Sequence, residues 1–302
     1  MTLKKDNIVI SCANGKKTFE LVKILESVKK FNVFTTDLKN KKINTKNFFK
    51  NLGTNNKDYL KNLLENFEKY EIVKYIPLAD EEVFIASKNI KKFKSKNIKV
   101  YCNNYKNISI LNNKIKTLEL LTKYKVPVPK WRQFRNFKEY KSSIDFFFDI
   151  DLDLVIKPII SRGNRNINYF YKKDYRKLIQ KYFDFEKNFF INEKLYPKYY
   201  DIDLFSKKIT TKNNQIIRQN LNPHHPTIYK GFRFVKNKDI ENFSGIINKK
   251  FNNQFILDID AMTDKNKKIK VIEINSRPSG AFVHSLKKIE KLKNEFLEYI
   301  KK

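Results

Sequence analysis

The sequence predicts an α/β fold whose N-terminal sheet is parallel and whose C-terminal part is α+β, with antiparallel strands. Residues 7–37 have the pattern of strand, turn, helix and strand, and a strand that returns through a helix pairs in parallel with the first. Near the C-terminus, two strand-like segments flank a short polar connection, which is typical of an antiparallel hairpin. The length of 302 residues, of which 41% are hydrophobic, is sufficient for two or three packed domains.

The chain is strongly basic, with 64 Lys and Arg against 32 Asp and Glu, which gives a net charge of +32. A charge of this size raises nucleic acid or an anionic membrane as a partner. The excess lysine is spread over every segment together with abundant Asn, Ile, Phe and Tyr, a mixture typical of AT-rich codons. We therefore favour a solvated basic surface over a dedicated nucleic-acid-binding face.

Cys12 and Cys102 are the only cysteines, and each lies in or beside an apolar strand-like run. Two cysteines are too few for a Cys-rich metal cluster, so we expect buried thiols in a reducing compartment. No apolar stretch approaches ~18 residues, and no signal-peptide core follows Met1. We expect a soluble, cytoplasmic protein that does not enter membranes.

The N-terminal elements follow in order. Residues 7–12 are an apolar run of strand length, the apolar spacing of residues 19–25 indicates a helix, and residues 32–37 supply the next strand. A dinucleotide-binding turn needs three spaced glycines after the first strand, whereas this turn has only Gly15. The sequence therefore does not support NAD binding.

The next elements complete the N-terminal part. Residues 71–77 predict a strand, residues 78–94 a helix and residues 98–102 another strand. We expect this part to close near Leu111. Residues 38–70 match no element that we can assign.

The pattern changes after Leu111. Residues 113–121 have helical spacing, and residues 126–129, Val-Pro-Val-Pro, force an extended exit because each proline biases its predecessor away from helical backbone. Two further strands are expected around Lys157 and Glu193. The lysine-rich tail, residues 285–302, predicts one amphipathic helix.

The segment with the clearest chemistry is the expected hairpin near the C-terminus. Alternation along a strand places Asp258 with Asp260 on one face, and Glu273 with Asn275 on the corresponding face of the next strand. Clustered carboxylates repel one another unless a cation neutralises them, and hard oxygen ligands suit Mg²⁺, with Mn²⁺ as the alternative ion. Each acid taken singly fits the wet face of an edge hairpin, but the joint pattern favours a metal site.

The spacing of Asp260, Glu273, Asn275 and Arg277 resembles the signature of the ATP-grasp superfamily, the carboxylate–amine ligases related to the large subunit of carbamoyl phosphate synthetase. This resemblance extends over essentially the whole chain. It implies a pre-ATP-grasp α/β domain over residues 1–111 and a two-lobed ATP-grasp domain over residues 112–302. Within the latter, it implies a smaller nucleotide-covering lobe, residues 112–194, and a metal-binding lobe, residues 195–302.

The resemblance also implies residues that bind the phosphates of ATP. Lys114 opens the helix at the entry to the nucleotide-binding part, and Lys157 lies on the strand whose lysine contacts the α- and β-phosphates. A glycine in the following loop lets backbone N–H groups approach phosphate oxygens, and arginines there can pair with them. The loop residues that would cover the phosphates are Ser161, Arg162, Gly163 and Arg165.

The adenine hinge is expected at Glu193, which either accepts from the adenine amino group or orients the hinge, while the backbone of Lys194 and Leu195 reads the adenine edge. The family usually has a ribose-binding glutamate six residues after the hinge glutamate, where this chain has Tyr199. Asp201 lies on the same strand face and is the alternative ribose contact. The sequence leaves open which of the two contacts the ribose.

The sequence gives less information about the residues that would bind the substrate carboxylate. Arg218, Lys230 and Arg277 are electrostatic candidates for the substrate carboxylate and the γ-phosphate. His224 and His225 are adjacent and point in different directions on a strand, and no third ligand is spaced for zinc, so we expect loop polar residues. The sequence offers no Ser/His/Asp set or activated cysteine for covalent catalysis.

The function that these patterns favour is an ATP-dependent carboxylate–amine, or carboxylate–thiol, ligase that uses ATP and Mg²⁺ and acts through an acylphosphate. Its partners would be a small-molecule carboxylate and an amine, and a homodimer is an open alternative to a monomer. Two rivals stay open: a nucleotide-binding regulatory or scaffold protein without turnover, and a basic nucleic-acid-binding protein. The identities of the carboxylate and the amine are not specified by the sequence.

Overall fold

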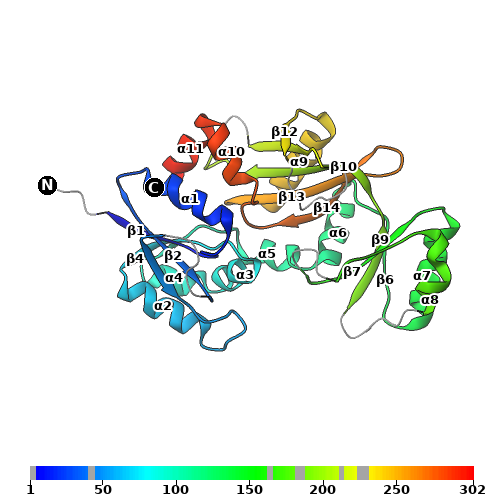
Figure 1. The fold of residues 1–302 in the computed structure, drawn as a ribbon, viewed down its shortest axis with the longest axis horizontal. Helices are drawn as coiled ribbons and strands as arrows, with labels where there is room; N and C mark the ends of the chain where they lie inside the picture. The colour runs from blue at the N-terminus through cyan, green and yellow to red at the C-terminus, as the bar shows by residue number, and fades with distance from the viewer. Residues whose placement is uncertain (1–4, 40–44, 162–165, 181–187, 211–213, 223–230) are drawn as a thin grey trace.

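The structure is a computed structural model that describes residues 5–39, 45–161, 166–180, 188–210, 214–222 and 231–302. Three sheets follow one another along the chain: a five-stranded parallel sheet, a four-stranded antiparallel sheet and a five-stranded antiparallel sheet. Figure 1 shows them as three regions, with the four-stranded sheet at the end farthest from the N-terminus. The predicted α/β architecture with antiparallel C-terminal lobes is confirmed.

The N-terminal sheet has the strand order β3-β2-β1-β4-β5, and each neighbouring pair is parallel. The predicted strand–helix–strand unit is present as β1, α1 and β2. The segment left unassigned in the sequence contains β3 and α2, whose buried residues Tyr59, Leu63 and Phe67 repeat at helical spacing. The bounds are β1 Asp6–Ile10, α1 Lys16–Glu26, β2 Phe31–Asp37, β3 Asn47–Lys50, α2 Tyr59–Lys69, β4 Ile72–Ile76 and β5 Lys99–Val100.

Two expected helices are each broken into two. The helix after β4 consists of α3 (Asp80–Lys88) and α4 (Ile90–Ser95), because Asn89 between them leaves the helical backbone region. The tail consists of α10 (Phe282–Lys288) and α11 (Glu290–Lys301), so the prediction of one continuous tail helix was wrong. Ile289 is extended at the break, with φ −120 and ψ 90, and packs on the same core as both helices.

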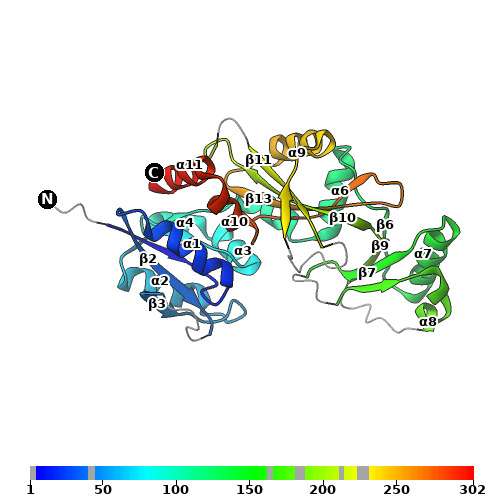
Figure 2. The ribbon, with the colours of Figure 1, turned by 45° about the horizontal axis from the view of Figure 1, so that its top comes forward.

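The C-terminal helices return to the N-terminal sheet. Residues of α10 and α11 share one hydrophobic core with β1 and α1, while α2, α3 and α4 supply the core on the opposite face. Figure 2 shows α10 and α11 beside α1. The start of the chain is thereby held against its end, which fixes the N-terminal sheet next to the metal hairpin predicted from the sequence.

The smaller lobe is the four-stranded sheet, with the order β6-β9-β7-β8. Helices α7 and α8 cover one of its faces through a core that includes Tyr140, Phe147, Ile156 and Ile191. The strands expected around Lys157 and Glu193 are confirmed as β7 and β9. The bounds are β6 Trp131–Gln133, α7 Phe137–Asp149, β7 Leu154–Pro158, β8 Asn168–Phe170, the short 3-10 helix Lys172–Asp174, α8 Tyr175–Gln180 and β9 Phe189–Glu193.

The larger lobe is the sheet β12-β11-β10-β13-β14, all antiparallel, with α6 and α9 packed on one face. The predicted hairpin is confirmed as β13 and β14, joined at residues 264–268. None of the helices in the described part of the chain is long and apolar enough to cross a membrane. The bounds are α5 Tyr105–Leu111, α6 Lys114–Lys123, β10 Tyr196–Phe205, β11 Gln215–Asn220, β12 Phe232–Phe234, α9 Lys238–Phe251, β13 Ile256–Thr263 and β14 Ile269–Asn275.

Candidate functional site

A cavity of ≈ 470 Å³ lies between the two lobes. The smaller lobe contributes residues of β7, β8 and β9, and the larger lobe contributes residues of β10, β13 and β14. Its lining mixes aromatic, aliphatic and charged side chains, which is typical of a small-molecule site of this volume. The lining includes Lys114, Val155, Lys157, Tyr169, Tyr171, Asn192, Glu193, Leu195, Tyr196, Tyr199, Asp260, Met262, Ile272 and Glu273.

Lys157 is the cation of the smaller-lobe wall. The β7–β9 register pairs it with Phe190, and the alternation of the strand directs both toward the cleft and away from α7. Its side chain is buried, with 5% exposure, and its ammonium lies 5.4 Å from the Phe190 ring centroid, without a hydrogen-bond acceptor among the described residues. Burial lowers the pKa of Lys157 to about 8, an effect that Glu273 opposes and Lys114 reinforces. An anion in the cavity would stabilise this charge.

Glu193 at the end of β9 is held by protein groups. One carboxylate oxygen accepts from the Lys130 backbone N–H at 3.0 Å, and both oxygens accept from the Lys270 ammonium at 2.8 and 2.9 Å. Of the two roles considered for Glu193, these contacts match the orientation of the hinge. Sequence reasoning missed Lys270, which is one lysine among many, and only the strand register brings it to the hinge.

The hinge presents two groups that could recognise a base. The Lys194 N–H donates to the Asp153 carbonyl at 2.8 Å, whereas the Leu195 N–H has no acceptor among the described residues. The buried side-chain oxygen of Asn192 likewise has no hydrogen-bond partner within the described ranges, and Asn192 lines the cavity. Sequence reasoning missed Asn192. Its signal was alternation, because the register sets it opposite Val155 on the face that carries Lys157.

A row of charged side chains crosses the larger-lobe sheet. Consecutive registers place Glu273 of β14 beside Asp260 of β13, Asp260 beside Asp201 of β10, and Asp201 beside Arg218 of β11. A second row lies two residues along each strand, on the same face. It places Asn275 beside Asp258 and Asp258 beside Asp203. The predicted metal residues Asp258, Asp260, Glu273 and Asn275 therefore lie together on one face of the sheet.

Arg218 lies behind the acids and does not line the cavity. It is 1% exposed, forms ion pairs with Asp201 and with Asp203 at 2.6 Å, and donates to the hydroxyls of Ser285 and Ser279 at 2.7 and 3.1 Å. Burial opposes its charge, but the two carboxylates more than compensate and raise the pKa of Arg218 above its ordinary value. In this arrangement the guanidinium neutralises carboxylates and does not face a substrate.

The cavity-facing acids are held by neighbours. The Tyr199 hydroxyl donates to Asp260, and the Lys114 ammonium donates to Glu273 at 3.0 Å and to the Ser161 carbonyl at 2.7 Å. Burial, with the charges of Asp201 and Glu273, raises the pKa of Asp260 to about 7. A cationic group therefore already contacts Glu273, as expected for a position that suits a metal ion.

Tyr199 and Asp201 differ in position relative to the cavity. Tyr199 is among the lining residues, while the buried Asp201 carboxylate contacts Arg218 beneath the row. Either residue as a ribose contact stays a prediction. The geometry favours Tyr199 because its side chain is at the cavity wall.

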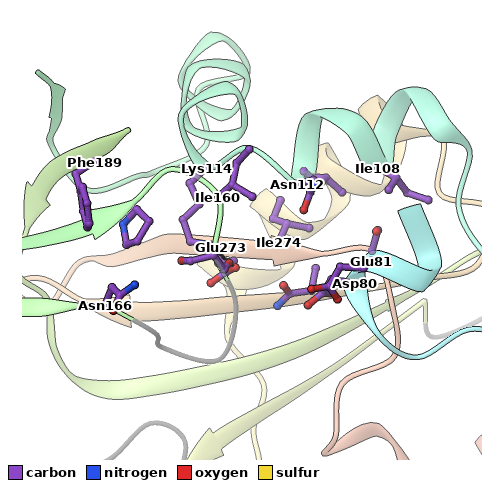
Figure 3. A pocket seen from close by; sticks show the side chains of 15 residues that line it. Asp80, Glu81, Ile108, Asn112, Lys114, Ile160, Asn166, Phe189, Glu273 and Ile274 are labelled. Atoms are coloured by element: carbon purple, nitrogen blue, oxygen red, sulfur yellow. Dashed lines mark hydrogen bonds and ion pairs between the residues drawn. The ribbon is translucent and has the colours of Figure 1, made fainter. Parts of the chain in front are cut away.

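Arg277 connects the hairpin to the N-terminal sheet. Its guanidinium pairs with Asp80 at the start of α3 at 2.6 Å and lies 3.9 Å from Asp258. A second cavity, of ≈ 440 Å³, opens beside this contact and shares Lys114 and Glu273 with the first. Figure 3 shows Glu273 with Phe189 and Asn166 on one side and Asp80 and Glu81 on the other. The two cavities therefore meet at Glu273.

Several predicted site residues fall outside the described part of the chain. Among the expected phosphate-covering residues, only Ser161 is described. The others, together with the acceptor-side candidate and the two adjacent histidines, are Arg162, Gly163, Arg165, Lys230, His224 and His225.

Comparison with known proteins gives a fold but no close relative. No family model matches the chain, and no curated protein matches it. Among solved structures, D-alanyl-alanine synthetase A from Vibrio cholerae is similar with a TM-score of 0.71 and 13% identity, over 100% of this chain and 98% of that one.

Two further solved structures are similar to this chain over nearly its whole length. N5-carboxyaminoimidazole synthetase from Staphylococcus aureus has a TM-score of 0.69 and 13% identity, over 99% of this chain and 78% of that one. Biotin carboxylase from Campylobacter jejuni has a TM-score of 0.69 and 15% identity, over 98% and 71%. The chain has the ATP-grasp fold.

Proposed function

We propose that this protein is an ATP-dependent ligase that joins a carboxylate to an amine, or to a thiol, and releases ADP and phosphate. The observation that carries the proposal is the pair of cavity walls: Asp260 and Glu273 face the cleft on one side, and on the other lies the Lys157 ammonium, from which no described residue accepts a hydrogen bond. A triphosphate with a bound cation complements both walls. The similar biotin carboxylase structure is a complex with β,γ-ATP, and N5-carboxyaminoimidazole synthetase has also been solved in complex with ADP, which supports the choice of nucleotide.

In this proposal the nucleotide lies along the cavity from the hinge to the acid row. The Leu195 N–H and the Asn192 side-chain oxygen would meet the edge of the base, and Lys157 would meet phosphate oxygens. Lys194 offers its side chain near Tyr171 and Tyr196, whose ring centroids lie 4.4 and 4.5 Å from its ammonium. The aromatic lining supplies apolar contact for a purine.

Asp260, Glu273 and Asn275 would hold Mg²⁺, or Mn²⁺, and Asp258 would support them from the adjacent position. The ion, when bound, neutralises charge on the β- and γ-phosphates. Lys114, which now contacts Glu273, would exchange that carboxylate for a phosphate oxygen. This arrangement accounts for a lysine at a carboxylate that the sequence pattern assigns to a metal.

The second cavity would receive the acceptor substrates, because it adjoins the first at Glu273. A substrate carboxylate oxygen would attack the γ-phosphorus while the bond to ADP breaks, and an amine would then displace phosphate from the acylphosphate. Arg277 lies near this cavity, where Asp80 holds its guanidinium in place. That guanidinium would orient the substrate carboxylate. Arg218 is proposed to act through Asp201 and Asp203, and Lys230 stays a candidate from sequence alone.

Carbon–nitrogen bond formation is the finer part of the proposal, and it rests on the similarity of the hairpin sequence to the large subunit of carbamoyl phosphate synthetase. A homodimer is also proposed, and sedimentation velocity tests it separately. The homodimer would stand or fall independently of ATP binding, whereas carbon–nitrogen bond formation requires it.

The test measures ADP release from MgATP with a panel of carboxylates and amines. We expect Glu273→Gln to lower turnover by about 100-fold or more while the fold is retained, because it removes a ligand charge at nearly constant volume. Glu119→Gln, at an exposed position on α6, is the matched control. Near-native ADP release by Glu273→Gln at saturating Mg²⁺ would contradict the proposed role.

A further inference from the structure

Three carboxylates form a compact group beneath the proposed nucleotide site. Asp201 comes from β10, and Asp258 and Asp260 come from β13, which is its neighbour in the sheet. Each residue offers one carboxylate oxygen, and these three oxygens lie within 4.8 Å of one another. Glu273 and Asn275, on the next strand, are not part of this group.

Among the described residues, the carboxylates around the group outnumber the cations that contact them. Asp203 lies beside Asp258 across the β10–β13 pair, so four buried or half-buried carboxylates are adjacent. Arg218 pairs with Asp201 and Asp203, whereas Arg277 is 3.9 Å from Asp258 and is already engaged by Asp80 at 2.6 Å. Buried carboxylates that exceed their cations are costly unless a further cation or protons neutralise them.

Asp258 provides independent support for a bound cation, because one of its two carboxylate oxygens lacks a partner among the described residues. One of its carboxylate oxygens is buried without a hydrogen-bond partner in the described part of the chain, while the other accepts from the Asn275 amide at 3.3 Å. The side chain as a whole is only 5% exposed. A buried carboxylate oxygen is rarely left without a donor or an ion, so the structure has a position for a ligand here.

The spacing limits the size of the ligand. Two oxygens bound to one Ca²⁺ at about 2.3–2.6 Å can be up to about 5 Å apart, whereas two bound to Mg²⁺ at about 2.0–2.1 Å can be only about 4.2 Å apart. Separations of up to 4.8 Å admit a Ca²⁺-sized ion, while Mg²⁺ would require any pair near that upper limit to contract. Arg218, bound to Asp201, would orient that carboxylate as an outer partner does in metal sites.

We propose that Asp201, Asp258 and Asp260 bind one hard divalent cation in the absence of nucleotide. The ion completes the charge balance of the rows and holds β10 and β13 in register at the floor of the cleft. It is distinct from the nucleotide-bound ion that Glu273 and Asn275 would hold together with Asp260, which would contact both ions, and its binding requires neither ATP nor turnover.

The experiment titrates Ca²⁺, and separately Mg²⁺, into the full chain after chelator treatment and without nucleotide, by calorimetry. We expect one Ca²⁺ per chain, bound more tightly than Mg²⁺. Asp258→Asn should weaken Ca²⁺ binding by about tenfold or more, because it removes a charged ligand. Glu119→Gln, the loss of one carboxylate at an exposed position on α6, should change it by less than about twofold.

Absence of Ca²⁺ binding to the nucleotide-free protein would overturn the inference, as it would mean that protons neutralise the group. Loss of binding in Glu273→Gln with retention in Asp258→Asn would overturn it too. If Asp258→Asn does not fold, the unmodified chain decides, because Ca²⁺ must raise its melting temperature relative to chelator. Ca²⁺ binding without any ATP binding would instead contradict only the proposed ligase function.

Discussion

The two walls of the cleft carry opposite charges and satisfy them in different ways. On the larger-lobe wall, Arg218 and Lys114 already contact three of the carboxylates. On the smaller-lobe wall, the Lys157 ammonium has a ring beside it but no acceptor among the described residues. The protein itself places a cation on three carboxylates of the acid wall, whereas no described residue accepts a hydrogen bond from the Lys157 ammonium.

The two walls are therefore expected to have different roles, one in stability and the other in ligand binding. Residues of the acid wall stabilise the fold and position one another, so changes there should alter stability as well as activity. Lys157 is costly to bury, and none of the residues that the structure describes accepts a hydrogen bond from its ammonium, so its replacement should alter binding and spare the fold. The following substitutions test that distinction.

The largest effect is expected from Arg218→Met. It leaves Asp201 and Asp203 buried without their shared cation, which should cost about 3–5 kcal/mol of unfolding free energy. Chemical denaturation of the purified variant measures this loss. A loss below about 1 kcal/mol would mean that the acids are neutralised by something other than Arg218.

Lys157→Met should have the opposite profile. Loss of a charge-assisted contact should weaken ATP binding by ~1.5–3 kcal/mol, or roughly ten- to more than a hundredfold, and weaken AMP binding less, because AMP lacks the β-phosphate. Unfolding free energy should stay the same or rise, since a buried charge is removed. Calorimetric titration of both nucleotides provides the measurement, and equal losses for ATP and AMP would assign Lys157 a structural role.

Tyr199→Phe should have a smaller effect. If the Tyr199 hydroxyl contacts the ribose, its removal should weaken ATP by about 0.5–1.5 kcal/mol, or roughly two- to tenfold, and leave 2′,3′-dideoxy-ATP unaffected. If Asp201 contacts the ribose, Tyr199→Phe should affect both nucleotides alike, through Asp260. Competition binding with the two nucleotides distinguishes these cases, and Asp201→Asn is the companion variant.

The smallest effect is a pH dependence. Since the pKa of Lys157 is lowered to about 8, ATP affinity should fall as pH rises above that value and the ammonium is lost. Between about pH 8 and the ordinary lysine value, the unfolded chain binds more protons than the folded one, so stability should increase with pH in that window. Lys157→Arg, whose guanidinium stays charged, should abolish both trends. An unchanged pH profile in this variant would assign them to another group.

The hairpin was predictable because a two-residue period and a short polar connection determine which acids lie side by side. The contacts of Arg218 were not predictable, since its partners depend on a register with β10 and on serines near α10 that no local pattern reveals. The contact of Lys270 with Glu193 at the hinge was not predictable for the same reason. Local patterns also failed at Ile289, where the apolar spacing continues although the backbone turns.

The central claim is that the cleft transfers the γ-phosphoryl group of ATP to a carboxylate. The most direct test uses a substrate carboxylate labelled with ¹⁸O, identified from the panel, together with unlabelled MgATP and the acceptor amine. Attack by the carboxylate predicts ADP and a phosphate that carries one ¹⁸O atom from the labelled substrate in each turnover. Phosphate labelled only from water, or formation of AMP and pyrophosphate, would contradict the account.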